Sequence, residues 1–193
     1  MVRKLLAVLL ALLLPTASLA DAAQVIDDAQ VLTEAARSRL SAAIVEAEEM
    51  YPVDLVVLLT YDVPADDSDT LWRVHDFADD FYDNGGYGAG GDSTGMLYLI
   101  DLNNGVQYIS TCGMMIRWID DAGEEMILDA AEPYLYDADW EAGALAAVRE
   151  TAEQLRTATA AAQPAAETDT TAVAASLLPL ALILSIVILG GGV

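Results

Sequence analysis

The sequence has very few positively charged side chains. Its 193 residues include 8 Lys and Arg against 31 Asp and Glu, which gives a formal net charge of −23. Arg3 and Lys4 lie in the first four positions, so from Asp21 onward six arginines and no lysine face all 31 acidic residues, a net charge of −25. Such a chain repels a phosphate backbone, which excludes nucleic acid as a partner.

Cysteine and histidine are almost absent. Cys112 is the single cysteine, which excludes a disulfide framework and a cysteine-based zinc site. It ends an apolar run, so we expect a buried, inert thiol. His75 is the single histidine and falls within an expected helix, with no serine placed beside it for a Ser-His-Asp triad. The sequence therefore contains no complete catalytic set of these kinds.

The two ends of the chain are its most hydrophobic parts. Residues 1–20 combine a basic start, an apolar run and small residues before Asp21, which predicts a signal peptide cleaved after Ala20. The alternative, an uncleaved anchor, requires a longer apolar run than this one. Residues 172–193 contain no charge and predict a transmembrane helix. We therefore expect a cell-membrane protein whose domain lies on the extracytoplasmic side.

Between these ends we expect one domain and a tether. Residues 157–171 are rich in Ala and Thr, contain Pro164 and have too few large apolar side chains to pack a core, which is typical of a flexible linker. Residues 21–156 are long enough for a single hydrophobic core. The domain boundaries predicted from the sequence are therefore 1–20, 21–156, 157–171 and 172–193.

The hydrophobic pattern of residues 21–156 predicts an α/β fold. Strands are expected at residues 53–60, 95–102 and 106–112, the last two joined by Asn103-Asn104-Gly105 as a hairpin turn. Helices are expected from Thr33 to Pro52 and at residues 70–82, 120–131 and 138–156, with Pro133 separating the last two. Strands joined through helices can be parallel, and the hairpin adds an antiparallel strand. We therefore predict a three-layer α/β/α sandwich with a mixed sheet.

Short motifs follow one another in the order seen in TPM domains. They are residues 27–33 (DDAQVLT), 77–88 (FADDFYDNGGYG), 95–100 (GMLYLI), 109–113 (ISTCG), 119–123 (IDDAG) and 133–139 (PYLYDAD). The chain resembles the TPM domain family over about residues 25–150, and a signal peptide and a C-terminal membrane helix are usual in that family. The resemblance implies an α/β/α sandwich and, for some relatives, calcium binding and acid phosphatase activity.

Acidic residues gather near the two loops that this topology places at one sheet edge. The candidate metal ligands are Asp80, Asp83, Asp92, Asp120 and Asp121. Carboxylates beside glycine-rich backbone suit a hard cation, Ca²⁺ or Mg²⁺. The alternative is that these acids are solvated loop and cap residues. Asp92 and Asp121 match acidic positions of the family, whereas Thr94 and Met115 depart from its pattern.

Two functions remain open at the level of the sequence. The first is a membrane-tethered, divalent-cation-binding interaction or assembly module of the cell envelope, with an envelope protein as partner. The second, implied by the resemblance, is a metal-dependent acid phosphatase in which Asp92 and Asp121 hold the metal and Arg117 steers phosphate. An ion pair of Arg117 with Asp120 or Asp121 is the simpler expectation for that arginine.

Aromatic side chains are a further clue to a partner. They are Trp118, Tyr134, Tyr136 and Trp140. Packing of the last two helices explains them, and a docking surface is the alternative. A domain that serves only as a structural spacer is the third and simplest function.

Overall fold

The computed structural model describes residues 24–65 and 70–162. The predicted signal peptide at residues 1–20 and the predicted transmembrane helix at residues 172–193 lie outside this range. Within the described residues, no helix is both long and apolar enough to cross a membrane. The described residues up to Leu155 belong to one compact unit, and Arg156–Ala162 belong to a second.

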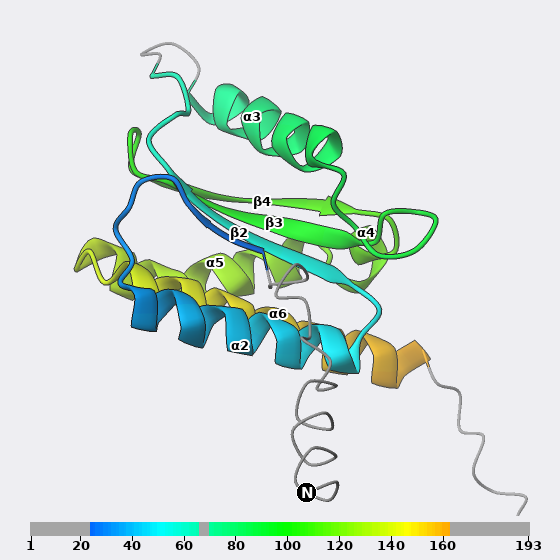
Figure 1. The fold of residues 1–193 in the computed structure, drawn as a ribbon. Coiled ribbons are helices and arrows are strands. Elements are labelled where there is room, and N and C mark those ends of the chain that lie inside the picture. Colours follow the sequence, from blue (N-terminus) through cyan, green and yellow to red (C-terminus); the bar gives the residue numbers. More distant parts are fainter. Residues whose placement is uncertain (1–23, 66–69, 163–193) are drawn as a thin grey trace, which may run out of the picture. The chain divides into compact units, whose positions relative to one another are not determined.

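The order of the elements is that of an α/β protein (Figure 1). The elements are β1 (Gln24–Asp27), α2 (Glu34–Met50), β2 (Asp54–Thr60), α3 (Thr70–Gly85), β3 (Gly95–Asp101), β4 (Val106–Cys112), α4 (Met115–Trp118), α5 (Asp121–Tyr136) and α6 (Trp140–Ala162). The Thr33 side chain caps α2 by accepting a hydrogen bond from the Ala36 amide, and Asp120 caps α5 through the Gly123 amide.

The strands form one mixed sheet in the order β1-β2-β3-β4. β1, β2 and β3 are parallel, and β4 runs antiparallel to β3, as the hairpin signal predicted. The turn between β3 and β4 places Gly105 at a φ of 67°, a left-handed conformation that glycine adopts without cost. The predicted mixed sheet is therefore confirmed.

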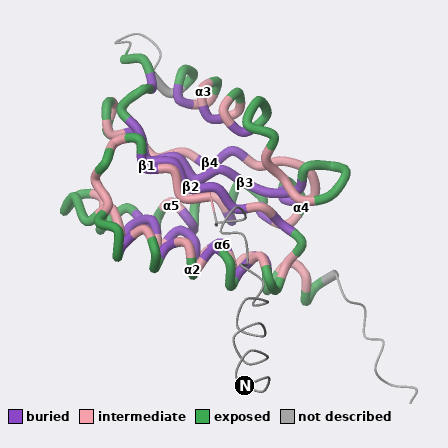
Figure 2. The backbone as a smooth tube through the Cα atoms, viewed as in Figure 1, coloured by how far each residue is buried: buried purple, intermediate pink, exposed green. Residues whose placement is uncertain are grey.

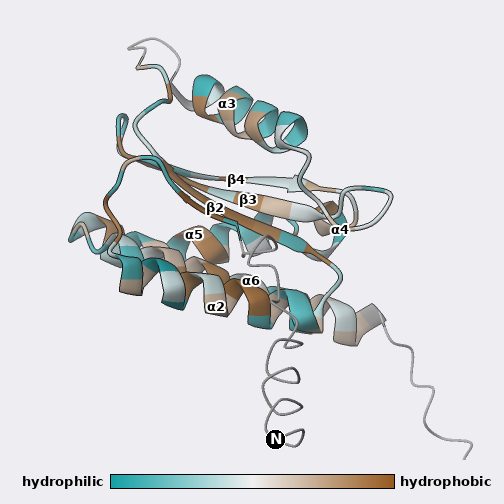
Figure 3. Cartoon of the chain, viewed as in Figure 1, coloured by the Kyte–Doolittle hydropathy of each residue, from teal (hydrophilic) through white to brown (hydrophobic). Residues whose placement is uncertain are grey.

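The two central strands are buried on both faces (Figure 2). Alternate side chains of each strand enter different clusters, since successive residues of a strand point to opposite faces. Leu55, Val57 and Leu59 pack with α2, α5 and α6, whereas Val56 and Leu58 pack with α3. Figure 1 shows the same division, with α3 on one side of the sheet and α2, α5 and α6 on the other. Hydrophobic residues accordingly concentrate on β2 and β3 (Figure 3).

The sheet has one strand more than the three predicted. β1 is only four residues long, pairs with β2 alone and keeps most of its side chains half-buried. Its last residue, Asp27, has a side chain with no exposed surface. The buried carboxylate is satisfied by hydrogen bonds that it accepts from the Val31 and Leu32 amides and from Arg37. A short strand ending in a buried acid lacks the apolar run that identifies a strand in a sequence.

The helices after the sheet also differ from the prediction. Pro133 lies inside α5, which continues to Tyr136, so the proline does not separate two helices. Pro133 is exposed in the last turn of α5, where its missing N–H removes one backbone hydrogen bond of the helix. α6 extends to Ala162, so the first six residues of the predicted linker are helical. The one-turn helix α4 was not predicted.

The start of β3 packs too closely for a side chain, which gives a test of the fold. A Cβ at Gly95 would lie 2.1 Å from the Asp54 carbonyl oxygen and 2.3 Å from the Tyr82 hydroxyl. We expect Gly95→Ala to lower the free energy of unfolding of the full chain by about 3 kcal/mol in urea denaturation, as overpacked cores do. Gly91→Ala is the matched control, because a Cβ there meets no atom within 4 Å. Equal stability of the two variants would contradict this packing.

Candidate functional site

Two loops meet at the edge of the sheet where β3 begins and β4 ends. We call this the glycine-rich edge, made of residues 86–94 before β3 and 113–120 after β4. The Thr94 hydroxyl oxygen accepts a hydrogen bond from the Met114 amide at 3.0 Å and donates one to Asp92 Oδ1 at 2.9 Å. The predicted meeting of these two loops is therefore confirmed.

Glycines allow the first loop to fold back on itself. Gly86, Gly88 and Gly90 have φ values of 74°, 107° and 73°, which other residues rarely adopt. The loop closes through two backbone hydrogen bonds of 2.9 Å between Ala89 and Thr94. A Cβ at Gly88 would lie 2.4 Å from the Ser93 backbone, so the tight turn requires glycine there.

A hollow of about 480 Å³ lies over this loop. Its lining contains two carboxylates, two tyrosines, one serine, one thiol and glycine backbone, and no basic residue. The lining residues are Tyr82, Asp83, Gly86, Tyr87, Gly88, Gly90, Gly91, Asp92, Ser93 and Cys112. The atoms of this lining that could bind a metal ion are therefore mainly carboxylate, hydroxyl and carbonyl oxygens.

Tyr82 contributes a hydroxyl group that lacks a partner. The residue is 1% exposed, and its hydroxyl oxygen makes no hydrogen bond in the described structure. Burial raises its pKa strongly, and the nearby Asp54 raises it further, so the hydroxyl keeps its proton at neutral pH. A buried hydroxyl without a partner is costly. It is also an uncommitted polar group beside the hollow.

Asp54 supports the hollow from the first residue of β2 and was not predicted as a site residue. Its Oδ2 accepts a hydrogen bond from the Gly88 amide at 2.7 Å, which ties the glycine loop to the sheet. Its charge contributes, after burial, to the raised pKa of Tyr87. The sequence signal was available, because Asp54 is the one charged residue within the apolar run 53–60.

The five predicted ligands do not form one cluster. Asp83 and Asp92 line the hollow. Asp80 is exposed on α3, Asp120 is committed to capping α5, and Asp121 is exposed in the first turn of that helix. Across the described residues, no three side chains of Asp, Glu, His or Cys come close enough to hold a metal ion. Metal binding at this edge stays a prediction.

The residue types that line the hollow are those that a hard cation accepts. Ca²⁺ accepts backbone carbonyls, hydroxyls and water beside one or two carboxylates, and the hollow provides Asp83, Asp92 and glycine-loop carbonyls. Zinc would need three or four nitrogen, sulfur or carboxylate ligands, which the described residues do not assemble. A hard cation, Ca²⁺ or Mg²⁺, stays a prediction for which Asp83 and Asp92 would supply the carboxylates.

Glu124 is a second residue that the sequence reasoning missed. It is half-buried on α5, and burial raises its pKa, with a further contribution from Asp121. The side chain of Thr111 on β4 donates a hydrogen bond that opposes this shift. Glu124 therefore adds a third carboxylate beside Asp120 and Asp121, one helical turn further along α5.

The other candidate catalytic residues lie in different surroundings. His75 stacks on Trp72 with ring centroids 5.4 Å apart, and its Nδ1 is 3.4 Å from Asp79 Oδ2. It does not line the hollow. Arg117 is exposed, and the described structure records no ion pair for it, unlike the expected pair with Asp120 or Asp121. Cys112 is half-buried and lines the hollow, instead of being enclosed in the core.

The aromatic residues divide into two pairs. Trp118 and Trp140 are partly buried against the main core, as packing of the last helices predicted. Tyr134 and Tyr136 are 44% and 81% exposed, which packing does not explain. An exposed tyrosine pair is thus available to a partner, whereas the tryptophans are held in place.

Glu124 gives a prediction about pH. Its pKa is higher in the folded chain than in the unfolded chain, so the folded chain binds more protons between the two values and loses stability as pH rises through that window. We expect Glu124→Gln to raise the melting temperature by a few degrees at pH 7 and by much less at pH 4. Thermal melts followed by circular dichroism measure this.

The control for that measurement is Glu125→Gln, an exposed carboxylate on the same helix. It should change the melting temperature little at either pH. A Glu124→Gln variant that melts lower than the unsubstituted chain at pH 7 would show that the hydrogen bond from Thr111 outweighs burial.

Comparisons with known proteins bear on the fold of the chain. The chain is similar to the NMR structure of the BA42 protein from the psychrophilic bacterium Bizionia argentinensis, with a TM-score of 0.57 and 16% identity over 66% of this chain and 83% of that one. It is also similar to the N-terminal domain of cg2496 from Corynebacterium glutamicum, with a TM-score of 0.52 and 17% identity over 67% and 78% of the two chains. At these identities the likeness shows the fold alone.

A third similar structure is the N-terminal domain of a protein from P. gingivalis, with a TM-score of 0.51 and 18% identity over 71% of this chain and 85% of that one. The comparison with curated proteins gives no match. The sequence matches the TPM domain over residues 25–154, about two thirds of its length, a range that includes β2, β3, β4 and the glycine-rich edge. The chain therefore belongs to the TPM domain family.

Proposed function

We propose that this protein is a membrane-tethered interaction or assembly module of the cell envelope whose TPM domain binds a divalent cation, calcium above all, at the glycine-rich edge. The observation that supports this most is the composition of the hollow. Asp83, Asp92 and Tyr82 line it together with glycine residues, and no basic residue does. These are the ligand types that hard cations accept.

The small number of carboxylates sets the expected strength of binding. Two carboxylates and neutral oxygens resemble the ligand sets of weak extracellular calcium modules, which have Kd values of about 10⁻⁴–10⁻³ M. Asp92 already accepts a hydrogen bond from Thr94, which orients its carboxylate. A site of this affinity would respond to the calcium level outside a cell and would be empty at cytosolic levels.

A binding role has better support than catalysis. Ser93 and Cys112 are the nucleophile types at the hollow, and the single histidine packs against Trp72 and Asp79 elsewhere on α3. Nucleophilic catalysis requires a base within hydrogen-bond reach of the nucleophile. In the described part of the chain, no base is recorded within hydrogen-bond reach of Ser93 or Cys112. The Ser110 hydroxyl donates a hydrogen bond of 2.6 Å to Asp79, but neither residue lines the hollow. The acid phosphatase, with Asp92 and Asp121 holding a metal and Arg117 steering phosphate, therefore remains the alternative.

Calcium binding is directly testable. Calorimetric titration of the full chain with CaCl₂ should give a Kd of about 0.1–1 mM, and 10 mM CaCl₂ should raise the melting temperature, because the ion binds the folded chain. Asp92→Asn and Asp83→Asn should each weaken binding about tenfold, since each removes a charged ligand. The same samples should not hydrolyse a phosphoester, with or without the ion.

Asp80→Asn is the matched control, because Asp80 lies on the same helix as Asp83 but does not line the hollow. Its calcium affinity should equal that of the unsubstituted chain. The absence of both binding heat and a melting shift in the unsubstituted chain would overturn the cation proposal. Phosphoester turnover abolished by Arg117→Ala would favour the phosphatase instead.

The membrane tether is a separate part of the proposal and rests on the sequence of residues 1–20 and 172–193. We expect the chain to stay with the membrane after alkaline extraction and to be released when residues 172–193 are deleted. To determine the side, Ala65→Cys in a Cys112→Ser background provides one exposed thiol. A membrane-impermeant maleimide should label it in intact cells. Labelling only after lysis would place the domain inside.

A further inference from the structure

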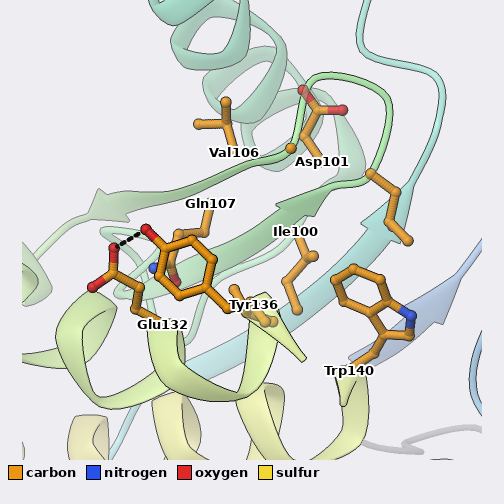
Figure 4. Close-up of a pocket in the computed structure, with 10 residues that line it drawn as sticks. Ile100, Asp101, Val106, Gln107, Glu132, Tyr136 and Trp140 are labelled. Atoms are coloured by element: carbon orange, nitrogen blue, oxygen red, sulfur yellow. Dashed lines mark hydrogen bonds between the residues drawn. The ribbon is translucent and has the colours of Figure 1, made fainter. Parts of the chain in front are cut away.

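A second cavity lies at the opposite end of the sheet, where β3 ends (Figure 4). It measures about 320 Å³ and is bounded by the β3–β4 hairpin and by the junction of α5 and α6. Its lining residues are Ile100, Asp101, Leu102, Gly105, Val106, Gln107, Glu132, Leu135, Tyr136 and Trp140. Carboxyl ends of strands are where open α/β sheets commonly bind ligands. We call this cavity the aromatic pocket.

The aromatic pocket has an apolar floor and two aromatic walls. Figure 4 places the rings of Tyr136 and Trp140 on opposite sides of the Ile100 side chain. Trp140 is half-buried against the core, which fixes it. Tyr136 is 81% exposed, but its hydroxyl donates a hydrogen bond of 3.1 Å to Glu132 Oε1 and so holds the ring beside the opening.

The deeper polar groups of the pocket are already satisfied by the protein. Gln107 accepts a hydrogen bond from the Tyr98 hydroxyl at 2.7 Å and donates one to the Leu128 carbonyl at 3.0 Å. The buried carboxylate of Asp101 accepts from the backbone and side chain of Asn104. Glu132, exposed at the mouth, is therefore the lining carboxylate that is open to a ligand.

The charged residues that line the pocket are all acidic. No basic residue lines it, and α5 contains none along its whole length. The C-terminal end of α5, the negative end of the helix dipole, lies at Tyr136, and Asp137 and Asp139 follow it. The nearby acid Glu141 is paired with Arg39 through two hydrogen bonds. Together these groups create a negative potential at an aromatic opening.

We infer that the aromatic pocket binds an arginine side chain of a partner protein. A guanidinium is planar, stacks on Tyr and Trp rings and pairs with a carboxylate through two hydrogen bonds, and its alkyl stem is apolar. Tyr136 and Trp140 supply the rings, Glu132 the carboxylate, and Ile100, Leu102 and Leu135 the apolar floor. The volume is at the lower limit for a ligand pocket, which suits one side chain.

This inference gives a chemistry to the partner in the proposed function and depends on that proposal only for the existence of a partner. The aromatic pocket shares no residue with the hollow of the glycine-rich edge. A negative result for calcium binding therefore leaves arginine binding possible, and a negative result for arginine binding leaves calcium binding possible.

The test uses the full chain in a non-ionic detergent, labelled with 5-fluorotryptophan. Trp72, Trp118 and Trp140 then give three fluorine signals that single Trp→Phe variants assign. Titration with the peptide acetyl-Gly-Gly-Arg-Gly-Gly-amide should shift the Trp140 signal and leave the Trp72 signal in place. The same peptide with citrulline, the neutral isostere of arginine, should bind at least about fivefold more weakly, because it lacks the charge.

Two variants and two matched controls locate the site. Tyr136→Ala and Glu132→Gln should each weaken peptide binding about fivefold, through loss of a cation–π contact and of an ion pair. Tyr134→Ala and Glu125→Gln lie on the same helix outside the lining and should not change it. Choline chloride and CaCl₂ serve as probes for a lipid headgroup and an inorganic ion.

Three results would overturn the inference. Equal binding of the citrulline peptide would mean that the pocket takes apolar groups without regard to charge. An unchanged affinity in the Tyr136→Ala and Glu132→Gln variants would place the peptide elsewhere. Tighter binding of choline or calcium than of the arginine peptide, at the same Trp140 signal, would assign the pocket to a headgroup or to an ion.

Discussion

The burial of β2 and β3 on both faces is the constraint on which the rest of this structure depends. Their side chains alternate between two hydrophobic clusters, one closed by α3 and the other by α2, α5 and α6. No face of these strands is open to a ligand, so polar ligand-binding groups are expected at the two ends of the sheet. The structure follows this division. One end has the glycine-rich edge with its oxygen donors, and the other has the aromatic pocket. In α/β proteins generally, loops at strand ends carry function because the buried sheet holds them in place.

The sequence predicted those features that depend on local pattern. The apolar run at 53–60 and the Asn-Gly hairpin predicted two strand pairings, and the chain direction then placed the loop before Gly95 beside the loop after Cys112. It missed β1, because four half-buried residues ending in Asp27 have no periodicity to recognise. The placement of helices was also beyond local pattern. β1, β2 and β3 are adjacent, yet α2 and α3 lie on opposite faces, so the two crossovers have opposite hands and one has the rare left-handed form.

Many acidic residues of this domain have structural roles, so the number of acidic residues in the sequence is a poor guide to a metal site. Asp120 caps α5, Asp139 accepts from the Ala142 amide, and Asp27 and Asp101 hold turns at the ends of β1 and β3. Each of these carboxylates satisfies backbone N–H groups that would otherwise lack partners. A sequence does not show which acids are committed in this way. Asp54 and Glu124, which the site prediction left out, are connected to this end of the sheet by their contacts with the Gly88 amide and with Thr111.

Negative charge alone does not decide what each end of the sheet can bind. The whole domain attracts cations, but at physiological ionic strength this attraction fades over about 8 Å, so selection falls to the groups that line each cavity. At the glycine-rich edge, the hollow is lined by glycine residues and two carboxylates, the ligand types that the proposed small, strongly hydrated ion would need. The aromatic pocket is lined mainly by rings and aliphatic side chains, so such an ion would find few ligands there to replace its hydration. A weakly hydrated organic cation loses less. The same excess of acidic residues can therefore serve two different ligands, one at each end of a sheet that is closed on both faces.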